Sequence, residues 1–328
     1  MLRIHFTVAD LNRTRVATAP DPLWELTLSM HQLRRRGSPP LLAGWKADLA
    51  HRLRPDTTLR HEISPALALN PPTGYFPDFL TPAEAADGFE AGLQALLDTP
   101  RDRLRAEIAL LGTDRHRLDP AALRIGDGDP AALRTLGRAL RRYHDVAVAP
   151  MWDRIRASFD ADRALRARTV LDGGAVALLN GLHPAARFTA GVLEIANYRA
   201  DRDLHLDGRG LVLVPSYFKA ASRPMALVDP NLPPVLVYPV ERSARVASEA
   251  GRASLSALLG RTRAAVLELA ADGPSTGTVA GRLGISAPAA SEHLTVLRDA
   301  GLVVSTRQGN TVRHTLAPLG HTLLDGGP

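Results

Sequence analysis

One segment near the carboxyl end of the chain combines an apolar face with a row of small polar side chains. Ala290, Leu294 and Leu297 are spaced i, i+4 and i+7, which places them on one side of a helix. The start and opposite side of that helix would present Ser286, Ala287, Pro288, Ser291, Glu292 and Thr295, with Arg298 at its flank. Hydroxyl and guanidinium groups donate hydrogen bonds to phosphates and base edges, and small side chains let a helix approach the major groove closely. This face predicts contact with double-stranded DNA, although the carboxylate of Glu292 would also repel phosphates.

The flanking sequence predicts two further helices that would hold this one in place. The first ends at Asp272-Gly273-Pro274, a run that cannot continue a helix. The second begins at Thr276 or Thr278, either of which can cap it, and ends at Gly284, the residue type that closes helices in the left-handed conformation. Ser286 is then a suitable N-cap for the third helix.

Two β-rich runs follow the third helix. Leu302–Thr306 and Thr311–Leu316 are joined by Arg307-Gln308-Gly309-Asn310, a hairpin signal. Arg307 and Arg313 flank the expected tip, where a narrow minor groove attracts arginine. Three helices followed by a β-hairpin is the element order of a winged helix-turn-helix domain.

The same stretch resembles the DNA-binding domain of ArsR-type winged-helix repressors. The resemblance rests on LGRTRAAVLELAADGP, on TVAGRLGISAPAASEHLTVLRDAGLV and on the ending RHTL. The pattern S-x-x-x-x-S-x-H-L-x-x-L-R-x-A-G-L-V carries the specific part, with Ser286, Ser291, His293, Leu294, Leu297, Arg298, Ala300, Gly301, Leu302 and Val303. It covers less than a quarter of the chain. The preceding region, with DPLWELTLSMHQLRR and GRGLVLVPSYF, looks like the poorly characterised N-terminal domain of large actinobacterial members of that family.

The resemblance implies a homodimeric, cytoplasmic transcriptional repressor that binds a two-fold symmetric operator. Metal sensors of this family use cysteine pairs or Asp/His sets, and this chain has no cysteine. His321 and Asp325 could share a helix face, but one such pair does not make a four-ligand site, so we expect no metal and no cofactor. Only 317–328 follow the second strand, which is short for a dimerisation helix, so we expect dimerisation in the N-terminal region.

The whole chain predicts an α+β fold, mostly helical, in several parts. In this interpretation, residues 1–171 form a helical N-terminal domain. It begins with a strand in Met1–Val8, and two of its helices begin at Asp21-Pro22 and Asp129-Pro130. Residues 172–240 contain β-like runs and form a small antiparallel sheet packed on those helices. Residues 241–257 are a linker helix, and residues 258–328 are the winged helix-turn-helix domain.

Large aromatic side chains gather in the N-terminal domain. Trp24, Trp45 and Trp152 could line a pocket for a small-molecule effector. Packing in an ordinary hydrophobic core explains the same residues. The sequence leaves both alternatives open.

Composition excludes few classes of protein. The 328 residues carry 40 Lys and Arg against 34 Asp and Glu, and this net charge of +6 is spread thinly, so it permits DNA binding without requiring it. No apolar run is long enough to span a bilayer, so we expect no membrane partner.

Enzymatic motifs are weak: His61-Glu62 lacks the second His of a metallopeptidase helix, and Ser216 lacks a nucleophile elbow. We therefore expect no enzyme; the alternative is an enzyme or small-molecule-binding protein that uses the winged helix for protein assembly.

Overall fold

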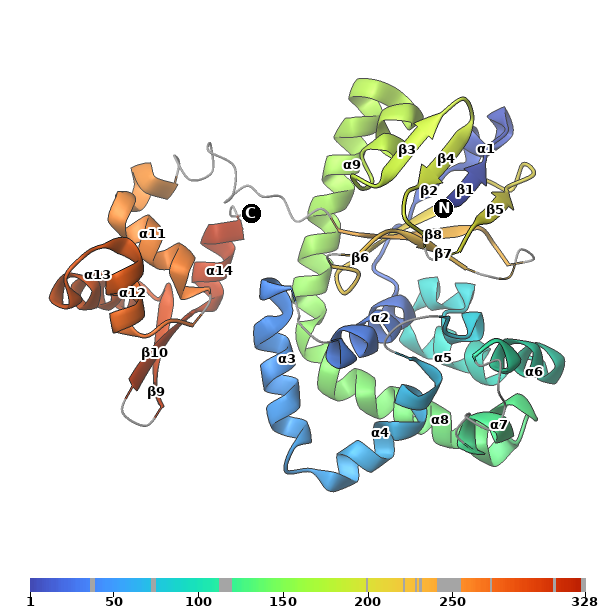
Figure 1. The fold of residues 1–328 in the computed structure, drawn as a ribbon, viewed down its shortest axis with the longest axis horizontal. Coiled ribbons are helices and arrows are strands. Elements are labelled where there is room, and N and C mark those ends of the chain that lie inside the picture. Colours follow the sequence, from blue (N-terminus) through green and yellow to red (C-terminus); the bar gives the residue numbers. More distant parts are fainter. Residues whose placement is uncertain are drawn as a thin grey trace. The chain divides into compact units, whose positions relative to one another are not determined.

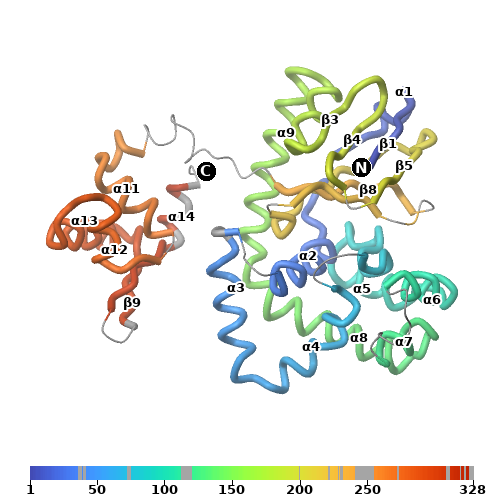
Figure 2. Tube along the Cα trace, in the orientation of Figure 1, coloured from blue at the N-terminus to red at the C-terminus, as the bar shows by residue number. Residues whose placement is uncertain are grey.

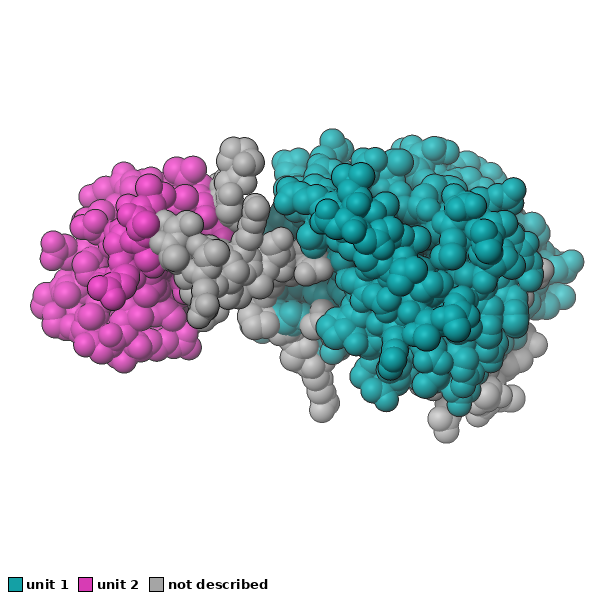
Figure 3. Space-filling view, turned by 90° about the horizontal axis from the view of Figure 1, so that it is seen from above, with its two compact units in different colours: residues 1–241 teal, residues 242–328 magenta. Residues whose placement is uncertain are grey.

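The chain contains helices and small sheets, with helix predominating, and so belongs to the α+β class. The computed structural model describes residues 1–35, 39–71, 75–111, 120–198, 200–220, 222–227, 229, 232–240, 255–271, 273–308 and 311–325. It divides into two compact units, unit 1 (residues 1–241) and unit 2 (residues 242–328), which Figure 3 shows in different colours. Most of the linker expected over 241–257 lies outside the described residues, and 255–259 are helical.

Helices make up most of unit 1 between its first and last strands (Figure 1). They are α1 (Val8–Arg13), α2 (Pro22–Arg34), α3 (Pro40–Leu53), α4 (Thr57–Leu69), α5 (Phe89–Leu97), α6 (Arg101–Leu110), α7 (Pro120–Gly126), α8 (Pro130–Tyr143) and α9 (Trp152–Asn180), with short turns of other helix types at Asp78–Leu80, Ala83–Asp87, His144–Val148 and Ala149–Met151. The expected starts at Asp21 and Asp129 are confirmed. The Asp21 carboxylate accepts hydrogen bonds from the backbone N–H groups of Leu23 and Trp24, and proline takes the first helical position.

The strands of unit 1 come from both ends of its sequence. They are β1 (Leu2–His5), β2 (Arg15–Val16), β3 (Ala186–Thr189), β4 (Val192–Ile195), β5 (Arg202–His205), β6 (Val212–Ser216), β7 (Met225–Ala226) and β8 (Val235–Pro239). They form sheet A, with the order β3-β4-β1-β5, and sheet B, with the order β2-β6-β8-β7.

The prediction of one small antiparallel sheet from residues 172–240 is wrong. Both sheets are mixed: β1 pairs with β4 in the antiparallel sense and with β5 in the parallel sense, while β2, β6 and β8 are parallel and β7 is antiparallel to β8. The strand expected in Met1–Val8 is present as β1, where Leu2 lies opposite Ile195. Figure 2 shows the blue N-terminal trace running among the yellow strands. The first residues of the chain therefore belong to the same folded body as residues 186–239.

Sheet B separates two hydrophobic cores. Along β6 and β8, Val214 and Val237 pack into the core formed with helices α2 to α8, while Leu213 and Leu236 pack into the core shared with sheet A. The alternation follows the two-residue period of a strand, and burial on both faces explains why these strands read as continuous apolar runs.

Helix α9 joins the helices to the sheets and runs past the composition change expected near residue 172. Its path is broken at Gly174, which adopts φ 65° and ψ −165°, a conformation open to glycine. A buried network anchors it: Arg166 pairs with Asp162 at 3.0 Å, and the Tyr238 hydroxyl donates to Asp162 at 2.7 Å. Arg166 also donates to the Gly181 carbonyl, so the chain beyond the break folds back beside the helix.

After the helical residues 255–259, the described part of unit 2 shows three further helices and a pair of antiparallel strands in the order expected from the sequence, followed by a last helix that was not expected. They are α11 (Arg261–Ala270), α12 (Thr276–Leu283), α13 (Ala287–Asp299), β9 (Val303–Gln308), β10 (Thr311–Leu316) and α14 (Pro318–Asp325). Ser275 is the N-cap of α12, accepting from the Thr278 N–H, so the predicted cap at Thr276 or Thr278 is wrong by one to three residues. Gly284 ends α12 in the left-handed conformation with φ 65°, as expected.

The last helix of unit 2 belongs to its core. Leu324 is buried with residues of α11 and α13, and a side chain at Gly320 would meet the carbonyl oxygen of Leu302 at 2.0 Å. The short tail expected after the hairpin is thus a helix packed closely on its own unit. Among the described residues of the whole chain, no helix is both long and apolar enough to cross a membrane.

Candidate nucleic-acid interface

Helix α13 is amphipathic in the way the sequence predicts. Ala290, Leu294 and Leu297 are buried in the core of unit 2, and they contribute the face that packs on α11 and α12. The predicted contact residues lie on the other side: Ser286, Ala287, Pro288, Ser291, Glu292 and Arg298 are exposed, and Thr295 is half-buried. The helix therefore presents hydroxyls and small side chains to solvent from a fixed base.

The start of α13 is fixed by its own sequence. The Ser286 hydroxyl accepts a hydrogen bond from the Ala289 N–H at 3.3 Å, and Pro288 occupies the first turn. Gly284 and Ser286 together set a tight connection from α12 to α13. The Ser286 oxygen is used as a cap here, and its hydroxyl hydrogen remains able to donate.

Charge on α13 is partly offset within the helix. Arg298 pairs with the neighbouring Asp299 at 3.4 Å, both side chains being about half exposed. An exposed pair of this kind contributes little to stability, but it reduces the net positive charge at the end of the helix. Glu292 adds a further negative charge on the exposed side. Helix α13 is thus suited to hydrogen bonding rather than to attracting an anion from a distance.

Hairpin register places the two predicted arginines on opposite faces. Arg307 lies opposite Val312, and Arg313 lies opposite Thr306, one pair further from the turn. Because successive pairs alternate between faces, Arg307 and Arg313 project from different sides of the hairpin. The turn residues 309 and 310, expected as a Gly-Asn turn, lie outside the described residues.

Arg313 is held away from the hairpin tip. Its guanidinium donates to the Gly273 carbonyl at 2.9 Å, and its backbone forms a bridge with Ser275. The expectation that Arg313 flanks the tip is therefore wrong: Arg313 lies at the turn between α11 and α12. Arg307, which is exposed near the tip, keeps the expected position.

A cleft that the sequence did not reveal lies at this turn. It has a volume of about 330 Å³ and is lined by the Ser275 and Thr278 side chains at the start of α12 together with Arg282, Thr311 and Arg313. Two guanidinium groups, hydroxyls and a helix N-terminus form a site suited to a phosphate group. Thr278 and Arg282 are four residues apart, a spacing visible in the sequence, but the contribution of Arg313 depends on the hairpin register.

His314 ties the hairpin to the helices. Its ring is buried, with Nε2 2.9 Å from the Thr276 hydroxyl on α12 and Nδ1 2.9 Å from the Ser305 hydroxyl on β9. Burial, with a smaller contribution from Arg298, lowers the pKa of His314. The ring is therefore a neutral positioning group that fixes α12, β9 and β10 relative to one another. By contrast, the ring of His293 on α13 is half-buried.

The three tryptophans considered for an effector pocket lie in the core of unit 1. Trp24 packs edge-on against Phe76, and Trp45 packs near Phe218 while its indole N–H donates to the Ala147 carbonyl at 2.7 Å. Trp152 is half-buried against the same core. These contacts are those of core packing, and no tryptophan is among the residues that line the cleft beside α12 or the pocket bounded by Arg35 and His183.

Other chemistry is sparse in the described part of the chain. No group of three or more His, Asp or Glu there could hold a metal ion. Ser216 is buried and donates to the Glu25 carboxylate at 3.0 Å, which is a structural contact. Comparisons of the chain with models of protein families, with curated proteins and with solved structures find no match.

Proposed function

We propose that the chain is a sequence-specific DNA-binding transcriptional regulator similar to ArsR-type repressors, in which unit 2 acts as a winged helix-turn-helix domain. The exposed polar face of α13 carries this proposal. Its buried side is fixed by Ala290, Leu294 and Leu297, so the opposite side can enter a major groove without disturbing the core.

In this function α13 reads base edges. Ser291 and Thr295 can bond base edges or phosphates, and Ala287 can meet a thymine methyl group. Arg307 near the hairpin tip is suited to a neighbouring minor groove. These side chains are short, so recognition requires the helix itself to lie deep in the groove.

Phosphate contacts come from the cleft beside α12. The start of α12 supplies the hydroxyls of Ser275 and Thr278, while Arg282 and Arg313 supply positive charge. A phosphate bound there would fix the register of α13 on the duplex, because α12 and α13 share one core.

We further propose that the protein acts as a homodimer on a two-fold symmetric operator. Two copies of α13 would then occupy successive major grooves, with half-sites roughly 34 Å apart, one turn of the duplex. Unit 1 would set that spacing or respond to an effector.

The test is selection of bound fragments from random duplex DNA by the purified protein, followed by affinity measurements on the selected sequence. A palindromic sequence should be enriched. Ser291→Glu should weaken its binding by about 100-fold or more, because a carboxylate in the groove faces phosphates and loses the hydroxyl contact.

Thr262→Glu is the matched control. Thr262 is exposed on α11, so this change adds the same charge to the same unit without placing it on α13. Absence of enrichment, or equal losses in the two variants, would contradict the proposed function.

A further inference from the structure

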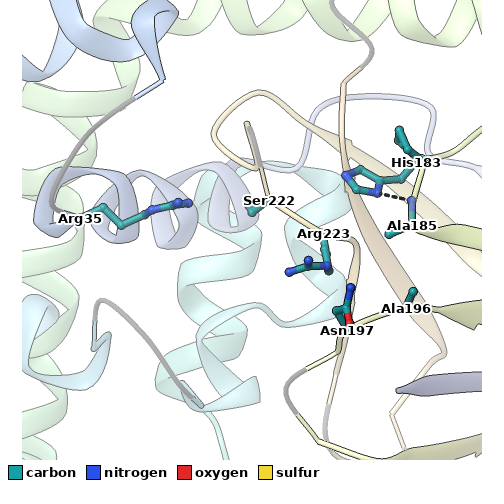
Figure 4. Close-up of a pocket in the computed structure, with 8 residues that line it drawn as sticks. Arg35, His183, Ala185, Ala196, Asn197, Ser222 and Arg223 are labelled. Atoms are coloured by element: carbon teal, nitrogen blue, oxygen red, sulfur yellow. Dashed lines mark hydrogen bonds between the residues drawn. The ribbon is translucent and has the colours of Figure 1, made fainter.

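Unit 1 contains an open pocket built from segments that are far apart in the sequence. It has a volume of about 580 Å³. Arg35, at the end of α2, and His183, in the turn before β3, lie on its wall with Asn197 after β4 and with Ser222 and Arg223 between β6 and β7 (Figure 4). Pockets of this size accommodate small organic molecules.

The charge around this pocket has one sign. Among the described residues, no carboxylate lines it, and neither Arg35 nor Arg223 forms an ion pair. Lys219 is 7% exposed, and no described carboxylate pairs with it. It lies close enough to Arg35 and to His183 for their charges to affect one another. Arg35 and Arg223 are exposed at the pocket, whereas Lys219 is buried behind it. Like charges gathered without a counter-ion repel one another, so an anion in the pocket would be attracted by all of them.

Helix α2 anchors the segment that leads into Lys219, Ser222 and Arg223. The buried carboxylate of Glu25 accepts hydrogen bonds from the Ser216 hydroxyl and from the backbone N–H groups of Tyr217 and Phe218, at 2.7 to 3.0 Å. The Gln32 amide donates to the Phe218 carbonyl at 2.9 Å. Since Arg35 terminates the same helix, α2 carries one side of the positive wall and anchors residues 216–218, which lead into the other side.

Hydrogen-bond donors face the same space. The Ala185 N–H donates to His183 Nδ1 at 2.9 Å, so the neutral ring carries its proton on Nε2, where it can donate to a ligand (Figure 4). Asn197 is held in the left-handed conformation with φ 54°, one that asparagine tolerates better than most residues. Pro184, Ala185 and Ala196 supply the small apolar part of the wall.

We infer that this pocket is a binding site for a small molecule that carries a phosphate or carboxylate group. The guanidinium groups of Arg35 and Arg223 would pair with the oxyanion, and the side chains of His183 and Asn197 would donate hydrogen bonds to it. The small apolar wall limits the rest of the ligand to a compact body. The inference concerns unit 1 alone and does not depend on DNA binding by unit 2.

Proton linkage supports the assignment. Burial, with a contribution from Arg35, lowers the pKa of Lys219 to about 7. Besides Arg35, the titratable groups near Lys219 are His31 on α2 and His183 at the pocket. Burial lowers the pKa of both; the charge of Lys219 adds to this for His31, and the charges of Arg223 and Lys219 add to it for His183. An anion favours the charged form of every one of these groups. Binding should therefore be accompanied by proton uptake and should be tighter below pH 7 than above it.

The experiment is calorimetric titration of the full chain with inorganic phosphate and, separately, with citrate. Saturable binding of at least one of them is expected, and the stronger of the two identifies the group that the site prefers. Arg35→Gln and Arg223→Gln should each weaken that binding by about tenfold or more, because each removes a charge-assisted pair.

Arg134→Gln is the control, since Arg134 is exposed on α8, which contributes nothing to the pocket. It should leave the affinity unchanged. Failure of both probes to bind at millimolar concentration would overturn the inference. So would binding that persists in Arg35→Gln and Arg223→Gln, or an equal loss in Arg134→Gln. Because no DNA is present, these results stand apart from the test of the proposed DNA-binding function.

Discussion

Unit 1 and unit 2 both carry arginines at their candidate binding surfaces, but the surroundings of the positive charge differ. In unit 2, Arg298 is paired with Asp299, and the guanidinium of Arg313 donates to the Gly273 carbonyl. In unit 1, neither Arg35 nor Arg223 pairs with any carboxylate in the described part of the chain. Positive charge is thus partly offset beside α13 and concentrated in the pocket.

This difference in the arrangement of positive charge fits two kinds of anionic ligand. A duplex offers a long row of phosphates, so many weak contacts add up and no single one needs a strong local field. A small molecule offers one or two charged groups, so the site must gather several positive charges at one point. The two proposals therefore predict different responses to salt, to substitution and to pH.

The largest expected difference lies in the response to salt. DNA affinity should fall by about a thousandfold or more between 50 and 200 mM salt if a dimer makes six or more phosphate contacts. Binding of inorganic phosphate in the pocket of unit 1 displaces few counter-ions and should fall far less steeply. Fluorescence anisotropy with the selected duplex and calorimetry with phosphate measure the two slopes. Equal salt dependence of DNA binding and of phosphate binding would contradict the distinction between many phosphate contacts in unit 2 and one bound anion in unit 1.

Replacing Lys219 should raise stability while reducing anion binding. The pKa of Lys219 is lowered from 10.5 to about 7 in the folded chain, so between those values the unfolded chain binds more protons and stability rises with pH. Below pH 7 the cost of burying the charge is fully present. Lys219→Met removes it and should raise the free energy of unfolding at neutral pH by an amount on the order of a few kcal/mol.

Urea unfolding followed by tryptophan fluorescence reports on unit 1, which contains Trp24, Trp45 and Trp152. Lys46, the other lysine of the chain, provides the contrast, because its ammonium donates to the Gln32 and Arg35 carbonyls. Lys46→Met should lower stability. A loss of stability in Lys219→Met as well would show that Lys219 is a satisfied structural residue.

Substitutions of Arg282 and Arg298 test which arginines of unit 2 contact DNA phosphates. Arg282→Ala removes a charge from the cleft beside α12, so it should weaken binding about equally for all DNA sequences and reduce the salt slope by about one for each protomer. Arg298→Ala should have a smaller effect on the slope, because Asp299 already offsets Arg298. Anisotropy at several salt concentrations measures both variants, and the reverse order of effects would contradict this assignment of phosphate contacts.

Much of unit 2 could be predicted from the sequence because its determinants are local. Ser286 caps α13, and Gly284 closes α12, from within a few residues of the ends they define. Ala290, Leu294 and Leu297 show their common face by spacing alone. The position of Arg313 could not be predicted in this way, because it depends on the hairpin register and on a bridge to Ser275.

Unit 1 could be predicted only in outline because its determinants are distant. Leu2 pairs with Ile195, and no local pattern links the two residues. In the sequence Glu25 is a charged residue in a helical segment, which would ordinarily be exposed. In the structure it is buried and accepts hydrogen bonds from the turn at 216–218. The pocket needs Arg35, His183 and Arg223 together, and these residues come from three segments that are far apart in the sequence. The aromatic residues could not distinguish a pocket from a core in the sequence, since core packing attracts them at least as strongly as ligands do.

The smallest expected effect compares two histidines. His314 has both ring nitrogens in hydrogen bonds to hydroxyls of unit 2, whereas His183 uses only Nδ1 to accept from Ala185, within the described contacts. Burial, with Arg223 and Lys219, lowers the pKa of His183. A bound phosphate would offset those two charges, so the pKa of His183 should rise, while that of His314 should stay unchanged. Histidine ring resonances followed by NMR through a pH titration, with and without phosphate, measure both values, and the spectra of His183→Gln and His314→Gln assign the two signals. A rise at both histidines would indicate a general ionic effect, and a rise at neither would mean that phosphate does not reach the charges that depress His183.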